Sequence, residues 1–106
     1  MEKINLNKIQ DQEVVPGFHL KVVHSKNMTL TYWRIEAASS LPEHSHLNEQ
    51  VTNIIEGEFE LTVDGKREIL KPNSVVVIPS NSVHSGRAIT DCKIIDVFYP
   101  VRDDYR

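Results

Sequence analysis

Apolar and polar residues alternate along much of the chain, which is the pattern of strands that bury one face. The clearest case is residues 58–63, where every second residue of EFELTV is apolar. The pair Asp64-Gly65 follows and predicts a type I′ turn into a second strand over residues 66–70. The two segments therefore predict a β-hairpin with one face in the core.

Further strands are predicted by segments rich in Thr, Tyr, Trp, Val and Ile. They lie at residues 28–37, 75–78 and 93–99, with weaker signals at 18–23 and 51–55. No segment has a convincing 3.6-residue period of an amphipathic helix. Short strands that recur every eight to twelve residues or so are typical of an antiparallel sandwich or barrel. We therefore expect an all-β fold.

The length and apolar content predict one domain. The chain has 106 residues, of which 40% are hydrophobic, enough for one modest core. No linker or repeat divides it, so we expect a single domain over residues 1–106, with residues 1–15 as an N-terminal strand or arm. In that arm Ile4, Leu6 and Ile9 could pack on the barrel or add a strand to a neighbouring subunit. Because open sheet edges recruit partners, we also expect a homodimer.

Charge and composition argue against several classes of partner. The net charge is -3 and the 12 basic residues are scattered, which leaves no footprint for nucleic acid or an anionic membrane. The single cysteine, Cys92, cannot form an intramolecular disulfide, and no cationic neighbour in sequence would activate its thiol. No apolar run has the length of a membrane span or a secretory signal. We expect a cytoplasmic protein that binds a small molecule.

Three of the five histidines lie in two short patches with the chemistry of one metal site. His44 and His46 are one residue apart, so on a strand both side chains would leave the same face. Gln50 lies at even spacing from His46, and a barrel could bring His84 opposite the pair. A His-x-His pair alone is often only a polar strand face, but the second patch favours one divalent ion. Zinc, nickel, iron and manganese are not distinguished.

The order of these residues resembles the two motifs of the cupin family. The first motif corresponds to residues 44–57, from the His-x-His pair to a glycine, and the second to residues 79–84, from a proline to a histidine. The resemblance implies a double-stranded β-barrel, or jelly roll. It also implies that the ion is held by His44, His46, Gln50 and His84.

Three positions depart from the cupin pattern. The family usually has glycine where Asn73 and Asn81 stand, and asparagine is the residue that next best tolerates a left-handed backbone. It usually has glutamate where Gln50 stands, so a neutral ligand here leaves the ion its full charge and favours an anionic substrate. A strand bulge would present Glu49 in place of Gln50, and both alternatives stay open.

Within the cupins the chain resembles the pectin-degradation group, which acts on unsaturated uronates released by polysaccharide lyases. The resemblance rests on residues 42–46 and the pair Glu49-Gln50, on residues 79–85 with Arg87 and Ala88, and most specifically on the tail over residues 96–105. It implies that Asp96 and Arg102 belong to the active site. We place Phe98 beside Arg102 as a substrate-binding residue.

The alternation of the last strand gives Asp96 two possible environments. Ile94, Asp96 and Phe98 share one face of a strand over residues 93–99. If that face lines the barrel, the carboxyl is poised as an acid or base, because burial raises its pKa and a metal lowers it. If the face is outside, Asp96 is merely solvated.

Arg102 likewise has two interpretations. After Pro100 it could fold over the barrel mouth and hold a substrate carboxylate through two hydrogen bonds. Alternatively it is a surface arginine paired with Asp103 or Asp104.

These observations support three hypotheses for function. The first is a metal-dependent enzyme that converts 4,5-unsaturated uronate monosaccharides to linear keto forms, with Asp96 moving the proton and Arg102 binding the carboxylate. The second is a metal-dependent dioxygenase, which needs a redox-active ion with open positions. The third is a non-catalytic cupin that binds a small molecule.

Overall fold

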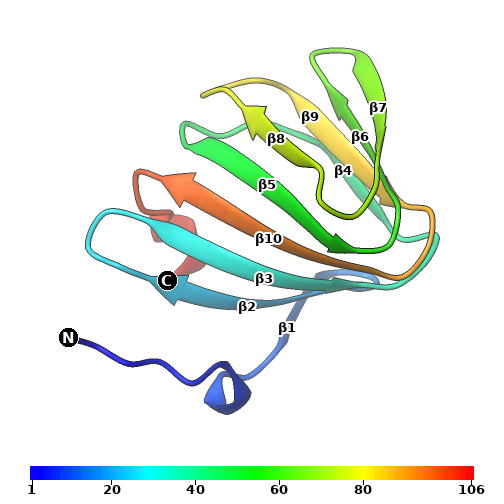
Figure 1. Cartoon of the computed structure of the whole chain (residues 1–106). Coiled ribbons are helices and arrows are strands. Elements are labelled where there is room, and N and C mark those ends of the chain that lie inside the picture. The colour runs from blue at the N-terminus through cyan, green and yellow to red at the C-terminus, as the bar shows by residue number, and fades with distance from the viewer.

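Strands account for most of the chain in a computed structural model that describes all residues 1–106 (Figure 1). Two single 3-10 turns, η1 (Leu6–Lys8) and η2 (Asp103–Tyr105), are the only helical elements. Neither approaches the length or hydropathy that a membrane-crossing helix requires. The strands are β1 (Gln12–Val15), β2 (Phe18–His24), β3 (Thr29–Ile35), β4 (Ser40–His44), β5 (Glu49–Glu56), β6 (Phe59–Val63), β7 (Lys66–Leu70), β8 (Val75–Ile78), β9 (His84–Ala88) and β10 (Cys92–Tyr99).

The strands form two antiparallel sheets that face each other (Figure 1). The larger sheet has the order β1-β2-β3-β10-β5-β8, and the smaller has the order β4-β9-β6-β7. β10 lies in the middle of the larger sheet, paired with β3 on one side and β5 on the other. The all-β fold predicted from the alternation, and the jelly roll implied by the resemblance to cupins, are therefore confirmed.

The turns form as their residues predict. β6 and β7 pair as the expected hairpin, and both turn residues have positive φ, 48° at Asp64 and 82° at Gly65. Asn73 and Asn81 have φ of 74° and 64°, so asparagine provides the left-handed backbone at both positions.

Two strands were not predicted: β4 and β9. β4 and β9 are neighbours in the smaller sheet, and β4 contains the mostly exposed residues SLPEH. Neither segment alternates between apolar and polar residues, so the pattern gave no signal. They are strands because β9 pairs with β4 on one side and with β6 on the other.

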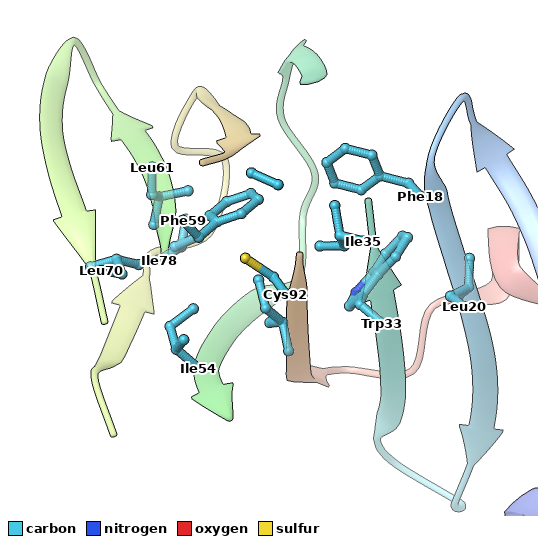
Figure 2. Close-up of a cluster of buried hydrophobic side chains, with 12 residues drawn as sticks. Phe18, Leu20, Trp33, Ile35, Ile54, Phe59, Leu61, Leu70, Ile78 and Cys92 are labelled. Carbon is cyan, nitrogen blue, oxygen red and sulfur yellow. The ribbon is translucent and has the colours of Figure 1, made fainter. Parts of the chain in front are cut away.

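The apolar core joins the two sheets at one end of the barrel (Figure 2). Phe18 of β2 meets Trp33 and Phe59 edge to face, with ring centroids 5.9 and 6.4 Å apart. Phe59 belongs to the smaller sheet, so this aromatic cluster spans both layers. Gly86 leaves room for it, because a Cβ at that position would overlap the Phe59 ring.

Residues 1–11 lie outside the barrel below β2 (Figure 1). Lys21 Nζ donates a hydrogen bond to the carbonyl of Leu6, and Arg34 pairs with Asp11 at 3.5 Å. The side chain of Ile4 is exposed. β1 adds a strand to the edge of the chain's own larger sheet.

Candidate metal centre

The polar end of the barrel brings His44, His46 and His84 together. Their nearest ring nitrogens all lie within 4.8 Å of one another. One detail of the prediction is corrected. His46 lies in the loop after β4, because that strand ends at His44, and the His46 ring donates a hydrogen bond to the carbonyl of Asn48. His84 is the cross-strand partner of His44 in the β4–β9 pair.

The hydrogen bonds of the three rings fix where each proton lies. Each Nδ1 is 2.9 Å from a backbone carbonyl oxygen, and because a carbonyl only accepts, each Nδ1 carries the proton. Each Nε2 is then left with a free lone pair, as a metal ligand requires. The accepting carbonyls belong to Pro42, Asn48 and Ser82.

Burial keeps two of these rings neutral. It lowers the pKa of His84 to about 4. Burial, and next the positive charge of Arg102, lowers the pKa of His46. The Nε2 of His84 is buried and has no hydrogen-bond partner in the protein. A bound divalent metal ion would give this buried atom a partner, so the donor set fits such an ion.

Gln50, and not Glu49, faces this cluster. Gln50 is buried while Glu49 is exposed, and β5 pairs with β8 without a bulge. The Gln50 amide nitrogen donates to the hydroxyl of Thr52 at 2.9 Å. This bond turns the amide oxygen toward His46, where it lies 3.1 Å from Nε2.

Asp96 lies inside the barrel, on the face that it shares with Ile94 and Phe98. One carboxyl oxygen accepts a hydrogen bond from the Trp33 indole N–H at 3.0 Å. The other oxygen is buried and has no partner. Burial raises the pKa of Asp96 to about 6.

One cavity is shared by His44, His84, Gln50 and Asp96. It is lined by apolar residues from the core end and by polar residues from the metal-binding end. The polar lining consists of His44, Gln50, Thr52, His84, Ser85, Asp96, Arg102 and Tyr105.

The structure agrees with part of each interpretation of Arg102. It pairs with Asp104 through two hydrogen bonds, yet its side chain is only 10% exposed and lines the cavity. Hydrogen bonding to Arg102 lowers the pKa of Asp104.

Sequence reasoning missed three residues around the site: Trp33, Asn48 and Tyr105. The indole N–H of Trp33 donates a hydrogen bond to Asp96, which lies 63 positions further along the chain. Asn48 bonds the carbonyl of Pro100, and the Tyr105 ring lies against Arg102. The buried polar character of Asn48 appears only once the chain is folded, so no local pattern could have marked it.

A second cluster, Glu13, His19 and Glu36, lies away from the cavity. His19 Nε2 is 3.0 Å from Glu36 and 3.5 Å from Glu13. Both glutamate side chains are more than half exposed, so this group is a surface ion-pair cluster and differs from the buried centre.

Comparison with known proteins agrees with this architecture. The Cupin domain family matches residues 31–98, which include the three histidines and Asp96. The chain is a cupin. The structure of KdgF from Halomonas sp. is 26% identical in sequence to this cupin, covers 94% of each chain and has a TM-score of 0.88.

Two further proteins place the cupin among its relatives. The pectin degradation protein KdgF of Dickeya dadantii is 25% identical over 71 residues, which are 66% of this chain and 64% of that protein. Salicylate 1,2-dioxygenase from Pseudoaminobacter salicylatoxidans has a TM-score of 0.79 at 17% identity, and the match covers 82% of this chain and 26% of that one. At this identity the likeness concerns the fold alone.

Proposed function

We propose that this cupin is a metal-dependent enzyme that converts 4,5-unsaturated uronate monosaccharides to linear keto forms. One observation carries the proposal: a buried carboxyl with a free oxygen shares a cavity with the imidazoles of His44 and His84, which cluster with His46. The similarity to two proteins named KdgF, one of them a pectin degradation protein, supports this substrate class.

Asp96 is the group that moves the proton. Ring opening needs a proton delivered to a ring carbon of an enol ether. The raised pKa of Asp96, about 6, keeps part of the population protonated near neutral pH. The Trp33 N–H holds one oxygen in place, and the other oxygen is free to reach the substrate.

Arg102 and Phe98 bind the sugar. The guanidinium of Arg102 lies at the cavity and carries the charge that complements a uronate carboxylate. The Phe98 ring lies 4.8 Å from the guanidinium carbon and 5.5 Å from the His46 ring, so it provides an apolar wall between them.

His44, His46, Gln50 and His84 hold one divalent ion. When bound, the ion supplies a Lewis acid that polarises an oxygen of the substrate. Gln50 contributes a neutral oxygen, so the charge of the site favours an anionic substrate.

The decisive experiment incubates the purified protein with unsaturated uronate generated by a polysaccharide lyase. Loss of ultraviolet absorbance from the conjugated double bond, corrected for the spontaneous reaction, measures the activity. A wild-type rate no faster than the background would end the isomerase proposal. Oxygen uptake in the same sample distinguishes the dioxygenase alternative, and binding without any turnover distinguishes the non-catalytic one.

We further infer a homodimer in the cytoplasm. The outer face of the larger sheet has a row of aliphatic side chains across five strands, in which Val23 pairs with Leu30, Leu30 with Val97, Val97 with Val51, and Val51 with Val77. Two copies of this self-similar row can pack about a two-fold axis. Light scattering should give twice the mass of the chain, and Val97→Asp should return the monomer.

A further inference from the structure

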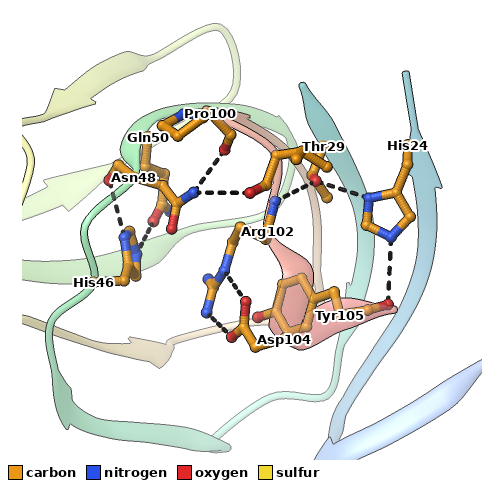
Figure 3. A network of polar contacts seen from close by, with 10 residues as sticks. His24, Thr29, His46, Asn48, Gln50, Pro100, Arg102, Asp104 and Tyr105 are labelled. Carbon is orange, nitrogen blue, oxygen red and sulfur yellow. Dashed lines mark hydrogen bonds and ion pairs between the residues drawn. The ribbon is translucent and has the colours of Figure 1, made fainter. Parts of the chain in front are cut away.

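The segment after β10 folds over the barrel mouth and surrounds the guanidinium of Arg102 (Figure 3). The guanidinium carbon of Arg102 lies 4.1 Å from the centroid of the Tyr105 ring and 4.8 Å from the centroid of the Phe98 ring. Along one edge, Nε and Nη2 donate to the two carboxylate oxygens of Asp104 at 3.2 and 2.6 Å. An arginine close to the end of the chain is therefore held on two ring faces and one edge.

The opposite edge of the guanidinium is left open. Arginine has five N–H groups, and Asp104 uses one on Nε and one on Nη2. Nη1 makes no hydrogen bond within the chain, and Arg102 lines the cavity. The remaining N–H groups on Nη1 and Nη2 form a fork of the shape that binds a carboxylate end-on.

Buried polar residues anchor the segment on both sides of the mouth (Figure 3). The Asn48 amide donates to the carbonyls of Pro100 at 2.6 Å and Val101 at 3.5 Å. The backbone N–H of Arg102 donates to the hydroxyl of Thr29 at 2.8 Å, and Thr29 is fully buried. The backbone leading into Arg102 is thus fixed before any ligand arrives.

We propose that Asp104 and Tyr105 are positioning residues that hold Arg102 ready to bind one carboxylate of the substrate. We call Arg102, Asp104 and Tyr105 the carboxylate clamp. The inference rests on the proposed function, because it takes the ligand to be a uronate. A mobile arginine loses rotational freedom about several side-chain bonds when it binds a ligand. This arginine is already ordered, so binding costs less conformational entropy and the affinity is higher.

Asp104 could have a second effect of opposite sign. Its negative charge neutralises the guanidinium, and a masking role would make Asp104→Asn bind anions more tightly. The geometry favours positioning, because Asp104 covers only the Nε edge and leaves the end of the fork free. The two effects therefore predict opposite changes in affinity for the same variant.

The test is calorimetric binding of galacturonate, a saturated uronate with no ring double bond to react, to the metal-loaded protein. Galactose is the neutral comparison. Wild type should prefer galacturonate, and Asp104→Asn and Tyr105→Ala should each weaken its binding about fivefold to tenfold, with little change for galactose. Tyr105→Phe keeps the ring and is the matched control, expected within about twofold of wild type.

The outcomes separate the two proposals. Unchanged or tighter galacturonate binding in Asp104→Asn, or wild type with no preference over galactose, overturns the clamp. Wild type that binds galacturonate selectively but does not turn over unsaturated uronate leaves the clamp standing and removes the enzymatic proposal. Metal content and melting temperature equal to wild type show that a variant's loss of selectivity is not a loss of fold.

Discussion

His46 Nε2 and Gln50 Oε1 face each other at 3.1 Å with no proton between them. The His46 proton lies on Nδ1, which bonds the Asn48 carbonyl, and an amide oxygen carries none. Two acceptors at this distance repel unless a cation lies beside both. The cupin fold prepares this arrangement through Thr52, which holds the Gln50 amide in the required orientation.

The first prediction is about one divalent metal ion per chain in purified protein. The double variant His44→Ala/His46→Ala should lose the ion, because it removes two of the three nitrogen donors. His19→Ala is the matched control, since its ring lies in the exposed cluster outside the barrel. Elemental analysis measures the content, and a double variant with wild-type metal would remove the site as described.

The second prediction concerns the proton-transfer role of Asp96. Asp96→Asn keeps the size of the side chain but cannot donate a carboxylic proton, so kcat should fall by about 10² to 10⁴. KM and bound metal should change little. Steady-state kinetics on unsaturated uronate measures the effect, and full activity in Asp96→Asn would remove this assignment while leaving the rest of the proposal intact.

The third prediction concerns stability and pH in the metal-free protein. The pKa of Asp96 is raised from 3.8 to about 6 in the folded state, so its contribution to stability is fully present below pH 3.8 and is lost as the pH rises through about 6. Asp96→Asn has no carboxyl at this position to lose a proton, so the variant is not destabilised in this way as the pH rises. The free energy of unfolding of the variant, relative to that of wild type, should therefore rise by on the order of 2 to 3 kcal/mol from pH 4 to pH 7.

Denaturant unfolding with a chelator present measures this gain at the two pH values. Asp103→Asn is the control, because that carboxyl is 81% exposed and should give no such gain. A gain of the same size in both variants would show that the effect does not come from burial of Asp96.

The fourth prediction concerns Arg102. Loss of its partly buried pair with the uronate carboxylate should cost on the order of 2 kcal/mol, so Arg102→Ala should raise KM about 30-fold with a smaller change in kcat. Arg102→Lys keeps the charge but loses the planar fork, and should recover only part of the affinity. Equal KM in wild type and Arg102→Ala would place the carboxylate elsewhere.

The fifth prediction concerns the only thiol. Cys92 is buried, its Sγ lies 3.2 Å from the carbonyl of Glu58, and burial raises its pKa. A disulfide reagent at pH 8 should therefore titrate no thiol in the native protein and one thiol after denaturation. Rapid labelling of the native protein would show that the core opens near β10.

The sequence predicts this fold best where one local rule applies. Alternation placed β6, the Asp64-Gly65 turn placed β7, and runs of β-forming residues placed β8 and β10, each within a residue of the observed bounds. Asparagine marked two left-handed turns. It failed for β4 and β9, which are strands only because neighbouring strands complete their hydrogen bonds. Their pairing depends on the register of the whole smaller sheet, which no short segment encodes.

The residues of the candidate site also divide into those that a local motif predicts and those that it does not. The spacing of His44, His46 and His84 was enough to group them, because ligand chemistry leaves a mark in a motif. The bond between Trp33 and Asp96 joins residues 63 positions apart, and the bond from Asn48 to Pro100 spans 52. Such contacts depend on which strands lie side by side, so the side chains that orient the reactive groups became visible only in the fold.

Asn48 contacts both ends of the site, and we expect it to couple them. Its carbonyl holds the ring of His46, while its amide holds the backbone before Arg102. Coupling between two binding events is reciprocal, so an ion that steadies the His46 loop strengthens carboxylate binding by the same factor with which the carboxylate strengthens retention of the ion. Bound carboxylate ligand is then expected to slow the loss of the ion, so the ligand-free protein should release a bound ion faster than the liganded one.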